Sequence, residues 1–406
     1  MNPRLVKSVG WTLIVLTPVL VLGGIELLAR MLDLHPSGGP RPEIPVWLDR
    51  NIVAKEGEWI QLLSDSPGDL ANYYRTYQWD RYLFYKLRPH LDLMLTDVAT
   101  PAVIRDRTRW LFHTNAHGFN TPDVPFRKPH GVFRIVALGD SSTFGWGVDP
   151  QRNYPFLLEV ELKRRYPEAK IEVVNLGVCG YTSLQGRVLL EREALRYDPD
   201  VVILSYGSND FSRVPVAFDE LYERNLGWMG ALQSVMQHSR AYQVYASFLA
   251  GAAKRTSNRR VRGNADAEPR GVLNVGPEKS VANMMEMVRI AREHDIDPVF
   301  VTNCVRGSLG GPIHAAATRT GVPILNTENL LEASIAEVLG PGRFQETFKR
   351  YRDLYGDALV ERFPWLAVYL GDHCHPNIIG HQLIAEALAP MIAATPSFGA
   401  YRETLH

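Results

Sequence analysis

The strongest constraint on the fold is a regular alternation of short apolar segments with helical ones, which begins at residue 132. The apolar segments expected to form strands are 132–138, 171–176, 200–205, 298–302 and 323–325. The segments with helical spacing are 154–166, 184–197, 280–294 and 377–392. Short apolar strands that alternate with helices are typical of a parallel sheet covered on both faces. The sequence therefore predicts an α/β fold for this part of the chain.

Residues with chemically useful side chains or backbone follow the ends of these expected strands. Ser141 follows the first strand in LGDSST, and Gly180 follows the second in NLGVCGYTS. Asn209 follows the third strand in SYGSND. Asp372 and His375 lie in DHCHPN, directly before the last helix. Ligands bind beyond the carboxyl ends of parallel strands, so we expect these residues to gather at one edge of the sheet.

The residue types are those that acyl transfer needs. A serine hydroxyl is a poor nucleophile unless a neighbouring base takes its proton, and His375 is the candidate base. A carboxylate such as Asp372 can hold the imidazole in its useful tautomer. A simpler interpretation remains open for single residues: Ser141 also fits a helix cap, and Asp140 fits a structural turn residue.

Taken together and in this order, the four motifs resemble those of the SGNH (GDSL-type) hydrolase superfamily of esterases and acylhydrolases. The resemblance implies a three-layer α/β/α domain with a flavodoxin-like parallel sheet. It assigns Ser141 as the nucleophile and, through the pattern D-x-x-H-P, Asp372 and His375 as its partners. It assigns the oxyanion hole to the backbone N–H groups of Ser141 and Gly180 and to the side-chain amide of Asn209. We expect neither a cofactor nor a metal.

The resemblance implies ester hydrolysis through an acyl-enzyme on Ser141, with a small-molecule or glycan ester as substrate. A first alternative uses the same residues to transfer an O-acetyl group to or from an envelope polysaccharide, as some membrane-anchored relatives do. A second alternative is a binding protein that keeps the fold without catalysis. The acyl chain, the alcohol and the oligomeric state are not encoded in any motif.

The N-terminus carries an uncharged apolar run from Val9 to Ile25, preceded by Arg4 and Lys7. Seventeen residues rise about 25 Å as a helix, close to the ~30 Å hydrocarbon core of a bilayer. We expect an uncleaved membrane anchor over residues 1–34, with a cleaved signal peptide or a buried helix as alternatives. Basic residues before the span stay in the cytoplasm, which predicts a single-pass cell-membrane protein whose domain faces the periplasm or exterior.

Composition shifts divide the rest of the chain. A Pro/Gly-rich linker starts at residue 35. It is followed by an aromatic-rich stretch without a clear period, which we expect to pack on the main domain as an accessory layer. Two inserts interrupt the alternation of strands and helices. The first, 211–277, includes an amphipathic stretch over 226–249 that is followed by a run of basic residues. The second, 340–369, is rich in aromatic residues and directly precedes DHCHPN, so it can form a wall of the substrate site. We expect a membrane anchor at 1–34, a linker and accessory segment at 35–130, and a hydrolase domain at 131–394 that contains inserts at 211–277 and 340–369. A C-terminal tail is expected at 395–406.

Charge and cysteine content exclude further classes. The chain has 44 basic and 44 acidic residues, and this balance argues against a nucleic-acid binder. It has three cysteines, too few for a disulfide scaffold. Cys179 and Cys374 each precede an expected site residue, so a disulfide between them and two unlinked thiols both remain open. His113 and His117 lie four residues apart, but Asn115 between them favours a loop over a metal site.

Overall fold

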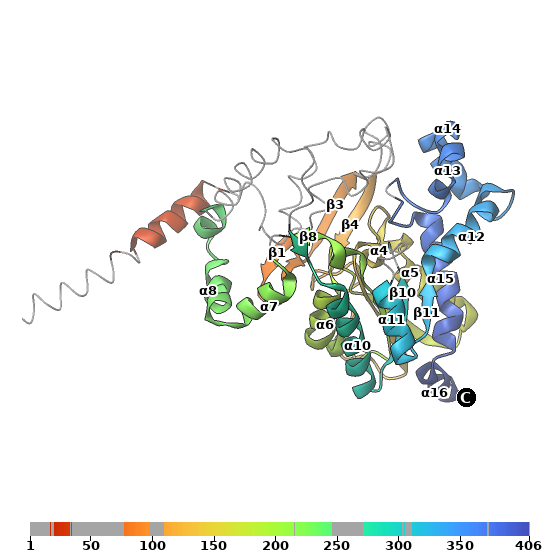
Figure 1. Ribbon diagram of the computed structural model, residues 1–406, viewed down its shortest axis with the longest axis horizontal. Coiled ribbons are helices and arrows are strands. Elements are labelled where there is room, and N and C mark those ends of the chain that lie inside the picture. The colour runs from red at the N-terminus through yellow and green to blue at the C-terminus, as the bar shows by residue number, and fades with distance from the viewer. Residues whose placement is uncertain are drawn as a thin grey trace, which may run out of the picture.

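The predicted parallel sheet is confirmed by the computed structural model (Figure 1), which describes residues 17, 20–32, 34, 77–96, 109–214, 216–245, 271–302, 304, 311–371 and 373–405. Its five strands lie in the order β11-β10-β7-β5-β6, and all four pairings are parallel. The strands are β5 (Val132–Gly139), β6 (Lys170–Asn175), β7 (Val201–Ser205), β10 (Asp297–Thr302) and β11 (Ile324–Asn326). This is the doubly wound order of flavodoxin-like sheets, with a switch point between β5 and β7.

The central strands are buried on both faces because successive side chains point to opposite sides of the sheet. Val136 and Leu138 of β5 belong to one apolar cluster, together with Val202 of β7. Ile135 and Ala137 of β5 belong to the other cluster. Each of these side chains is fully buried. This explains why the strands read as nearly continuous apolar runs in the sequence.

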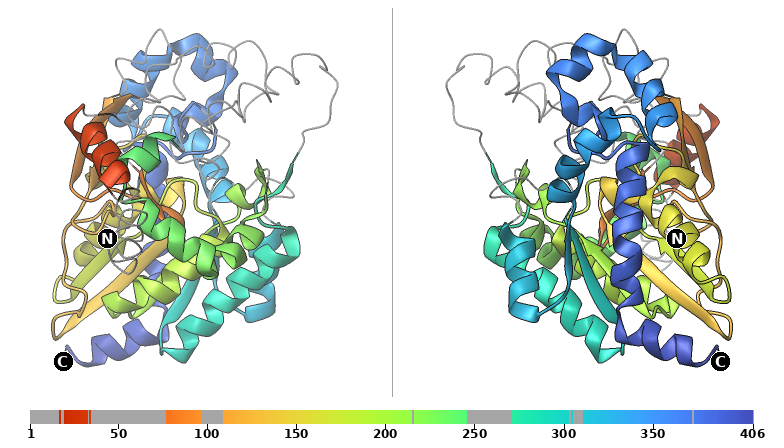
Figure 2. Two further views of the ribbon diagram at one scale, coloured as in Figure 1. Left: turned by 90° about the vertical axis from the view of Figure 1, so that its left-hand side faces the viewer. Right: turned by 90° about the vertical axis from the view of Figure 1, so that its right-hand side faces the viewer.

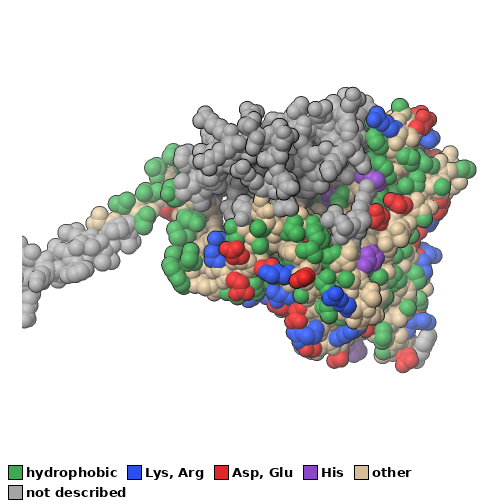
Figure 3. All heavy atoms as spheres, in the orientation of Figure 1, with side chains coloured by type: hydrophobic (Ala, Val, Ile, Leu, Met, Phe, Trp, Pro, Cys, Tyr) green, Lys and Arg blue, Asp and Glu red, His purple; other side chains and the backbone are tan. Residues whose placement is uncertain are grey.

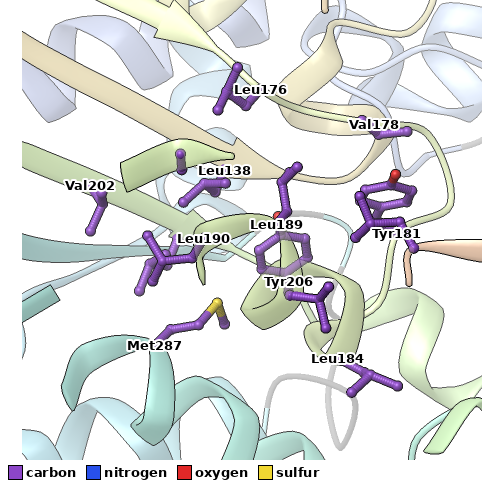
Figure 4. Close-up of a cluster of buried hydrophobic side chains, with 14 of the residues drawn as sticks. Leu138, Leu176, Val178, Tyr181, Leu184, Leu189, Leu190, Val202, Tyr206 and Met287 are labelled. Atoms are coloured by element: carbon purple, nitrogen blue, oxygen red, sulfur yellow. The ribbon is translucent and has the colours of Figure 1, made fainter. Parts of the chain in front are cut away.

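Helices cover both faces and complete the three layers. The first face is covered by α6 (Ser183–Arg192), α10 (Pro277–Glu293) and α11 (Gly311–Thr320). Figure 4 shows part of that core, with Leu138 and Val202 of the sheet close to Leu190 of α6 and Met287 of α10. The second face is covered by α5 (Tyr154–Arg165), α12 (Thr327–Leu339), α15 (Ile378–Ala393) and α16 (Pro396–Glu403).

The end of the chain differs from the expected tail. Residues 395–406 contain α16, whose Phe398 is fully buried. Its ring lies edge-on to Phe133 of β5, with 5.0 Å between the ring centroids. Thr395 caps α16 by accepting a hydrogen bond from the Phe398 backbone. The second-face core therefore extends past the boundary that we expected at residue 394.

The accessory segment forms two antiparallel strand pairs that pack onto the domain. They are β1 (Tyr77–Asp80) with β2 (Phe84–Leu87), and β3 (Leu91–Thr96) with β4 (Arg109–Thr114). Phe84 and Phe112 are fully buried in the same apolar cluster as α6 and α10. The aromatic residues of this stretch thus pack on the main domain, as expected of an accessory layer, and several of them are core residues.

The first insert is broken into several short elements. It holds β8 (Arg213–Val214), β9 (Val272–Leu273), α7 (Phe218–Leu226) and α8 (Trp228–Met236), and residues 240–245 are also helical. We expected one amphipathic stretch over residues 226–249, but α7 ends at Leu226 and α8 begins after Gly227. The basic residues that follow lie outside the described residues.

The second insert holds α13 (Gln345–Tyr355), α14 (Asp357–Arg362) and the 3-10 helix η7 (Pro364–Ala367). The helices α13 and α14 stand at one end of the molecule, at the top of both views in Figure 2. Phe348 and Tyr355 of α13 are buried against the second-face core. The Tyr351 hydroxyl of the same helix accepts a hydrogen bond from the Ile378 backbone N–H of α15 at 3.1 Å.

Most of the predicted membrane span lies outside the described residues. Residues 20–31 form a helix that projects from the body at one end of Figure 1. No single helix of the described residues has both the length and the apolar character needed to cross a bilayer. The bent pair α15 and α16, which meet at 68°, passes by length and composition alone.

Candidate active site

Ser141 lies at a tight junction between a strand and a helix. β5 ends at Gly139, Asp140 caps the next helix, and Ser141 is the first residue of α4 (Ser141–Phe144). The Asp140 carboxylate accepts a hydrogen bond from the Ser142 backbone N–H at 3.0 Å. A Cβ on Gly139 would lie 2.0 Å from the Thr143 hydroxyl, so only glycine fits there. Asp140 is therefore the helix cap, and the Ser141 side chain has no capping role.

His375 reaches Ser141 from the other end of the sequence. Its Nε2 lies 2.7 Å from the Ser141 Oγ, and the two residues are 234 positions apart. Both are 5% exposed, so the pair is largely shielded from water. His375 precedes α15, which Asn377 caps by accepting from the backbone of Ile379 and Gly380. The predicted third partner, Asp372, lies outside the described residues.

Asp140 links the serine to the end of β7. Its Oδ2 accepts hydrogen bonds from the Ser208 hydroxyl at 3.0 Å and from the Asn209 side-chain amide at 3.2 Å. Ser208 and Asn209 belong to the 3-10 helix η5 (Ser208–Phe211), directly after β7. Burial raises the pKa of the Asp140 carboxyl, and its hydrogen bonds work against that rise. The prediction that Ser141 and Asn209 would meet at one sheet edge is confirmed.

Gly180 lies in the loop after β6, beside Asn209. Its φ of +80° is in the left-handed region that favours glycine. The second hydrogen of the Asn209 amide is donated to the Tyr181 carbonyl at 3.2 Å. The Tyr85 hydroxyl donates to the Cys179 carbonyl at 3.1 Å, and the Tyr181 hydroxyl donates back to the Tyr85 carbonyl at 2.7 Å. The accessory strand β2 thus holds the residues on both sides of Gly180.

Ser141, His375, Gly180 and Asn209 therefore gather at the carboxyl edge of the sheet, as the four motifs predict. The family model described as "GDSL-like Lipase/Acylhydrolase family" matches residues 137–383, which contain all four. The chain belongs to this GDSL-like family. The predicted SGNH (GDSL-type) superfamily is thereby confirmed.

Individual relatives of this GDSL-family chain are distant. A protein of Mycoplasma pneumoniae (strain ATCC 29342 / M129 / Subtype 1), described as uncharacterized, is 30% identical over 144 residues. These residues are 34% of this chain and 16% of that protein, so the chain matches only a small part of its curated relative.

Three solved structures are similar to parts of the chain. Axe2, an acetylxylan esterase from Geobacillus stearothermophilus, is 16% identical with a TM-score of 0.37, over 65% of this chain and 95% of that one. CEX, a two-domain esterase active on acetylated mannans, is 15% identical with a TM-score of 0.37, over 68% and 50%. LAE5, an alpha/beta hydrolase from the metagenome of Lake Arreo, Spain, is 17% identical with a TM-score of 0.34, over 70% and 100%.

The cysteines pair differently from either arrangement considered for Cys179 and Cys374. Cys374 forms a disulfide with Cys304, across a Cα–Cα distance of 4.6 Å, and Cys179 is free and buried. Cys304 follows β10, at the same carboxyl edge of the sheet as Ser141. The rule that placed the other site residues would have placed Cys304 here too, but no motif drew attention to it. The disulfide joins this loop to the residue beside His375.

The two histidines upstream of the serine have separate partners. The His113 Nδ1 lies 2.8 Å from the Asp92 carboxylate, and the His117 ring contacts the Phe126 ring at a tilt of 38°, with 4.6 Å between centroids. Among the residues that the structure describes, no three His, Cys, Asp or Glu side chains are grouped to hold a metal. Asn120 of the same segment donates its amide to the Phe144 carbonyl at 2.7 Å, which supports the end of α4.

The second insert borders the site through His373. The Trp365 ring stacks on the His373 ring with 4.1 Å between centroids, and Tyr369 meets it edge-on at 5.3 Å. His373 is two residues from His375, so these aromatic rings flank the loop that carries His375.

Asp210 is a buried carboxyl next to Asn209. Its Oδ1 accepts the Ser183 backbone N–H at 2.8 Å, at the start of α6. Burial raises the pKa of Asp210 to about 6, and hydrogen bonds from Ser280 and Ser183 oppose this rise. An unfolded aspartate titrates near 3.9, so the folded chain binds more protons than the unfolded chain between these values. Asp210 therefore favours the folded state most at low pH, and this advantage is lost as the pH rises from about 4 to about 6.

We expect Asp210→Asn to weaken the dependence of stability on pH, because the neutral amide can still accept from Ser183. From pH 4 to pH 7, the free energy of unfolding of the variant should rise by on the order of 2 kcal/mol relative to that of wild type. Urea unfolding at both pH values measures this difference. Asp357→Asn is the control, since that side chain is 74% exposed. An identical change in wild type and Asp210→Asn would contradict the assignment.

We expect Asn209→Ala to lower kcat roughly 100- to 1000-fold, the usual effect of removing one oxyanion donor. Ser208→Ala is a matched control, because it removes the other donor to the same Asp140 oxygen. A neutral hydrogen bond is worth about 1 kcal/mol, so Ser208→Ala should cost less than about tenfold. Steady-state kinetics on an activated ester gives both values. Equal losses in the two variants would mean that Asn209 only anchors Asp140.

Proposed function

We propose that this chain is an esterase in which Ser141 attacks the ester carbonyl and His375 is the base. The observation that carries this proposal is the 2.7 Å contact between the His375 Nε2 and the Ser141 Oγ, in a pair that is nearly buried. Asp372 is the proposed partner of His375, by its place in the D-x-x-H-P pattern. We propose a small-molecule or glycan ester as the substrate.

The chemistry proceeds in two halves. His375 takes the Ser141 proton as the Oγ bonds to the carbonyl carbon, which places a negative charge on the carbonyl oxygen. The intermediate collapses, the ester C–O bond breaks, and His375 gives the proton to the leaving alcohol. Water then repeats the sequence: His375 takes a proton from water, the hydroxide displaces Ser141, and the proton returns to the Ser141 oxygen. The products are an acid and an alcohol.

The proposed oxyanion hole consists of the backbone N–H groups of Ser141 and Gly180 with the Asn209 amide. Both hydrogens of that amide are engaged at 3.2 Å, by Asp140 and by the Tyr181 carbonyl. Asn209 would then share one of them with the oxyanion as its charge develops. The hydrogen bond to Asp140 keeps the Asn209 amide close to Ser141 before substrate arrives, so the amide needs little rearrangement.

We also propose that residues 1–34 anchor the chain in the cell membrane, with the catalytic domain outside the cytoplasm. The apolar run from residue 9 to 25 and the basic residues before it support this topology. The disulfide between Cys304 and Cys374 supports it independently, because disulfides persist mainly in oxidising compartments.

We expect Ser141→Ala and His375→Ala each to lower kcat by at least about 10⁴-fold, and the double variant to be little worse, because the residues act as a unit. A fluorophosphonate probe should label the wild-type chain and not Ser141→Ala. The neighbouring Ser142 supplies the control: it is 1% exposed, and Ser142→Ala should keep its labelling and turnover.

Labelling that persists in Ser141→Ala would contradict the proposed nucleophile. A screen from acetyl to long-chain esters, run with and without an acetylated glycan, then separates hydrolysis from transfer. Release of free acid regardless of acceptor supports the esterase. Acyl transfer that requires a sugar acceptor would favour the O-acyltransferase instead.

We expect the full-length chain to stay in the membrane fraction through alkaline carbonate extraction, because an apolar helix of this length leaves a bilayer only at high cost. A variant that lacks residues 1–34 is the control and should be released. Release of the intact chain, or a mature N-terminus mapped near residue 25, would replace the anchor with a cleaved signal peptide.

A further inference from the structure

The helix α8 turns its apolar face away from the protein. Trp228, Met229, Leu232, Val235 and Met236 recur at helical spacing and are 75%, 53%, 50%, 71% and 38% exposed. The side that faces the protein is formed around the buried Gly230. The sequence of α8, WMGALQSVM, contains no charged residue. A helix on a globular protein normally buries its apolar face. The exposed apolar face of α8 therefore suits an apolar environment outside the chain.

The orientation of α8 is fixed by the domain. The Arg81 guanidinium donates to the carbonyls of Asn225 and Leu226 at 2.7 Å each, and to that of Gly227 at 3.1 Å. Asn225 returns a hydrogen bond to the Arg81 carbonyl at 3.1 Å. A Cβ on Gly230 would lie 2.0 Å from the Asn225 carbonyl oxygen, so α8 packs there without space for a side chain. The outward face is thus held by the body of the domain.

The N-terminal helix is joined to the chain just after α8. The Glu26 carboxylate accepts from the Ser239 hydroxyl at 2.8 Å and from the Arg240 and Ala241 backbones at 3.0 Å. Arg30 donates to the His238 carbonyl at 3.2 Å. Glu26 is the residue at which the uncharged apolar run ends. The place where the proposed anchor leaves the bilayer is therefore only a few residues from the end of α8.

The two apolar elements share one end of the molecule, at the left of Figures 1 and 3. Leu20, Val21 and Leu22 of the N-terminal helix are 72%, 54% and 66% exposed, and consecutive helical residues point to different sides of the helix axis. A second copy of the chain would cover one side of such a helix. A bilayer surrounds it completely, and the face of α8 is continuous with it.

We propose that α8 lies in the interfacial layer of the bilayer that the N-terminal anchor enters, with its apolar face among the lipid chains. Trp228 suits this layer, because tryptophan is enriched at membrane–water interfaces. Interfacial helices bind by burying one apolar face at the boundary between headgroups and acyl chains. The domain is then attached at two points, the anchor and α8, which fixes its orientation on the membrane. This inference rests on the anchor proposed above.

The test uses the full-length chain in lipid nanodiscs, with one spin label per sample at Leu232→Cys or Val235→Cys. The control is Arg164→Cys on α5, whose side chain is 68% exposed, close to the 71% of Val235. The native cysteines give little background, since Cys179 is buried and the other two are paired. Unchanged thermal unfolding shows that each labelled chain is folded. The measurement is the collision rate with oxygen, which partitions into lipid, relative to that with a polar nickel chelate.

We expect this ratio to be several-fold higher at positions 232 and 235 than at position 164. Equal ratios in a chain that has entered the nanodisc would overturn the inference and leave the anchor intact. A chain that does not enter nanodiscs would overturn both. Dipolar broadening at 235 that disappears on dilution with unlabelled chain would assign the face to a second copy, and would also overturn the proposal.

Discussion

The arrangement of the site depends on one buried carboxylate, Asp140. It is 1% exposed, and removing a charge from water is costly unless hydrogen bonds compensate it. Ser142, Ser208 and Asn209 supply those hydrogen bonds, from the ends of the two strands that flank the switch point. The requirement to satisfy this carboxylate thus brings the start of the serine helix and the end of β7 together. Geometry for catalysis and satisfaction of a buried charge are achieved by the same contacts.

The sequence allowed the sheet and the meeting of Ser141 with His375 to be predicted, because both follow from period and strand ends. Each of the five predicted strands agrees with the structure to within a residue or two. For the β1–β4 segment, packing on the domain was predicted but its strands were not, because its aromatic residues are buried by contacts with distant helices and follow no local pattern. The partner of Cys374 was missed for a similar reason: pairing depends on Cα separation, which requires the fold.

The loops around the serine are tied to one another more tightly than their sequences indicate. The disulfide at Cys374 fixes one side of His375, and the rings of Trp365 and Tyr369 pack against His373. On the other side of Ser141, Asn120 and Asn175 donate to backbone carbonyls of α4, at Phe144 and Thr143. Loops held in this way can keep reacting groups within a hydrogen bond of each other without ligand-induced rearrangement.

The reciprocal hydrogen bonds between Tyr85 and the loop of Cys179 and Tyr181 have a consequence for the size of the catalytic unit. The family model matches only from residue 137, yet β2 contributes to the core and is hydrogen-bonded to the residues on both sides of Gly180. A chain cut at residue 131 would uncover Tyr181 and leave two backbone or hydroxyl partners unmatched. The minimal folding unit therefore includes β2, which lies upstream of the residues that the family model matches.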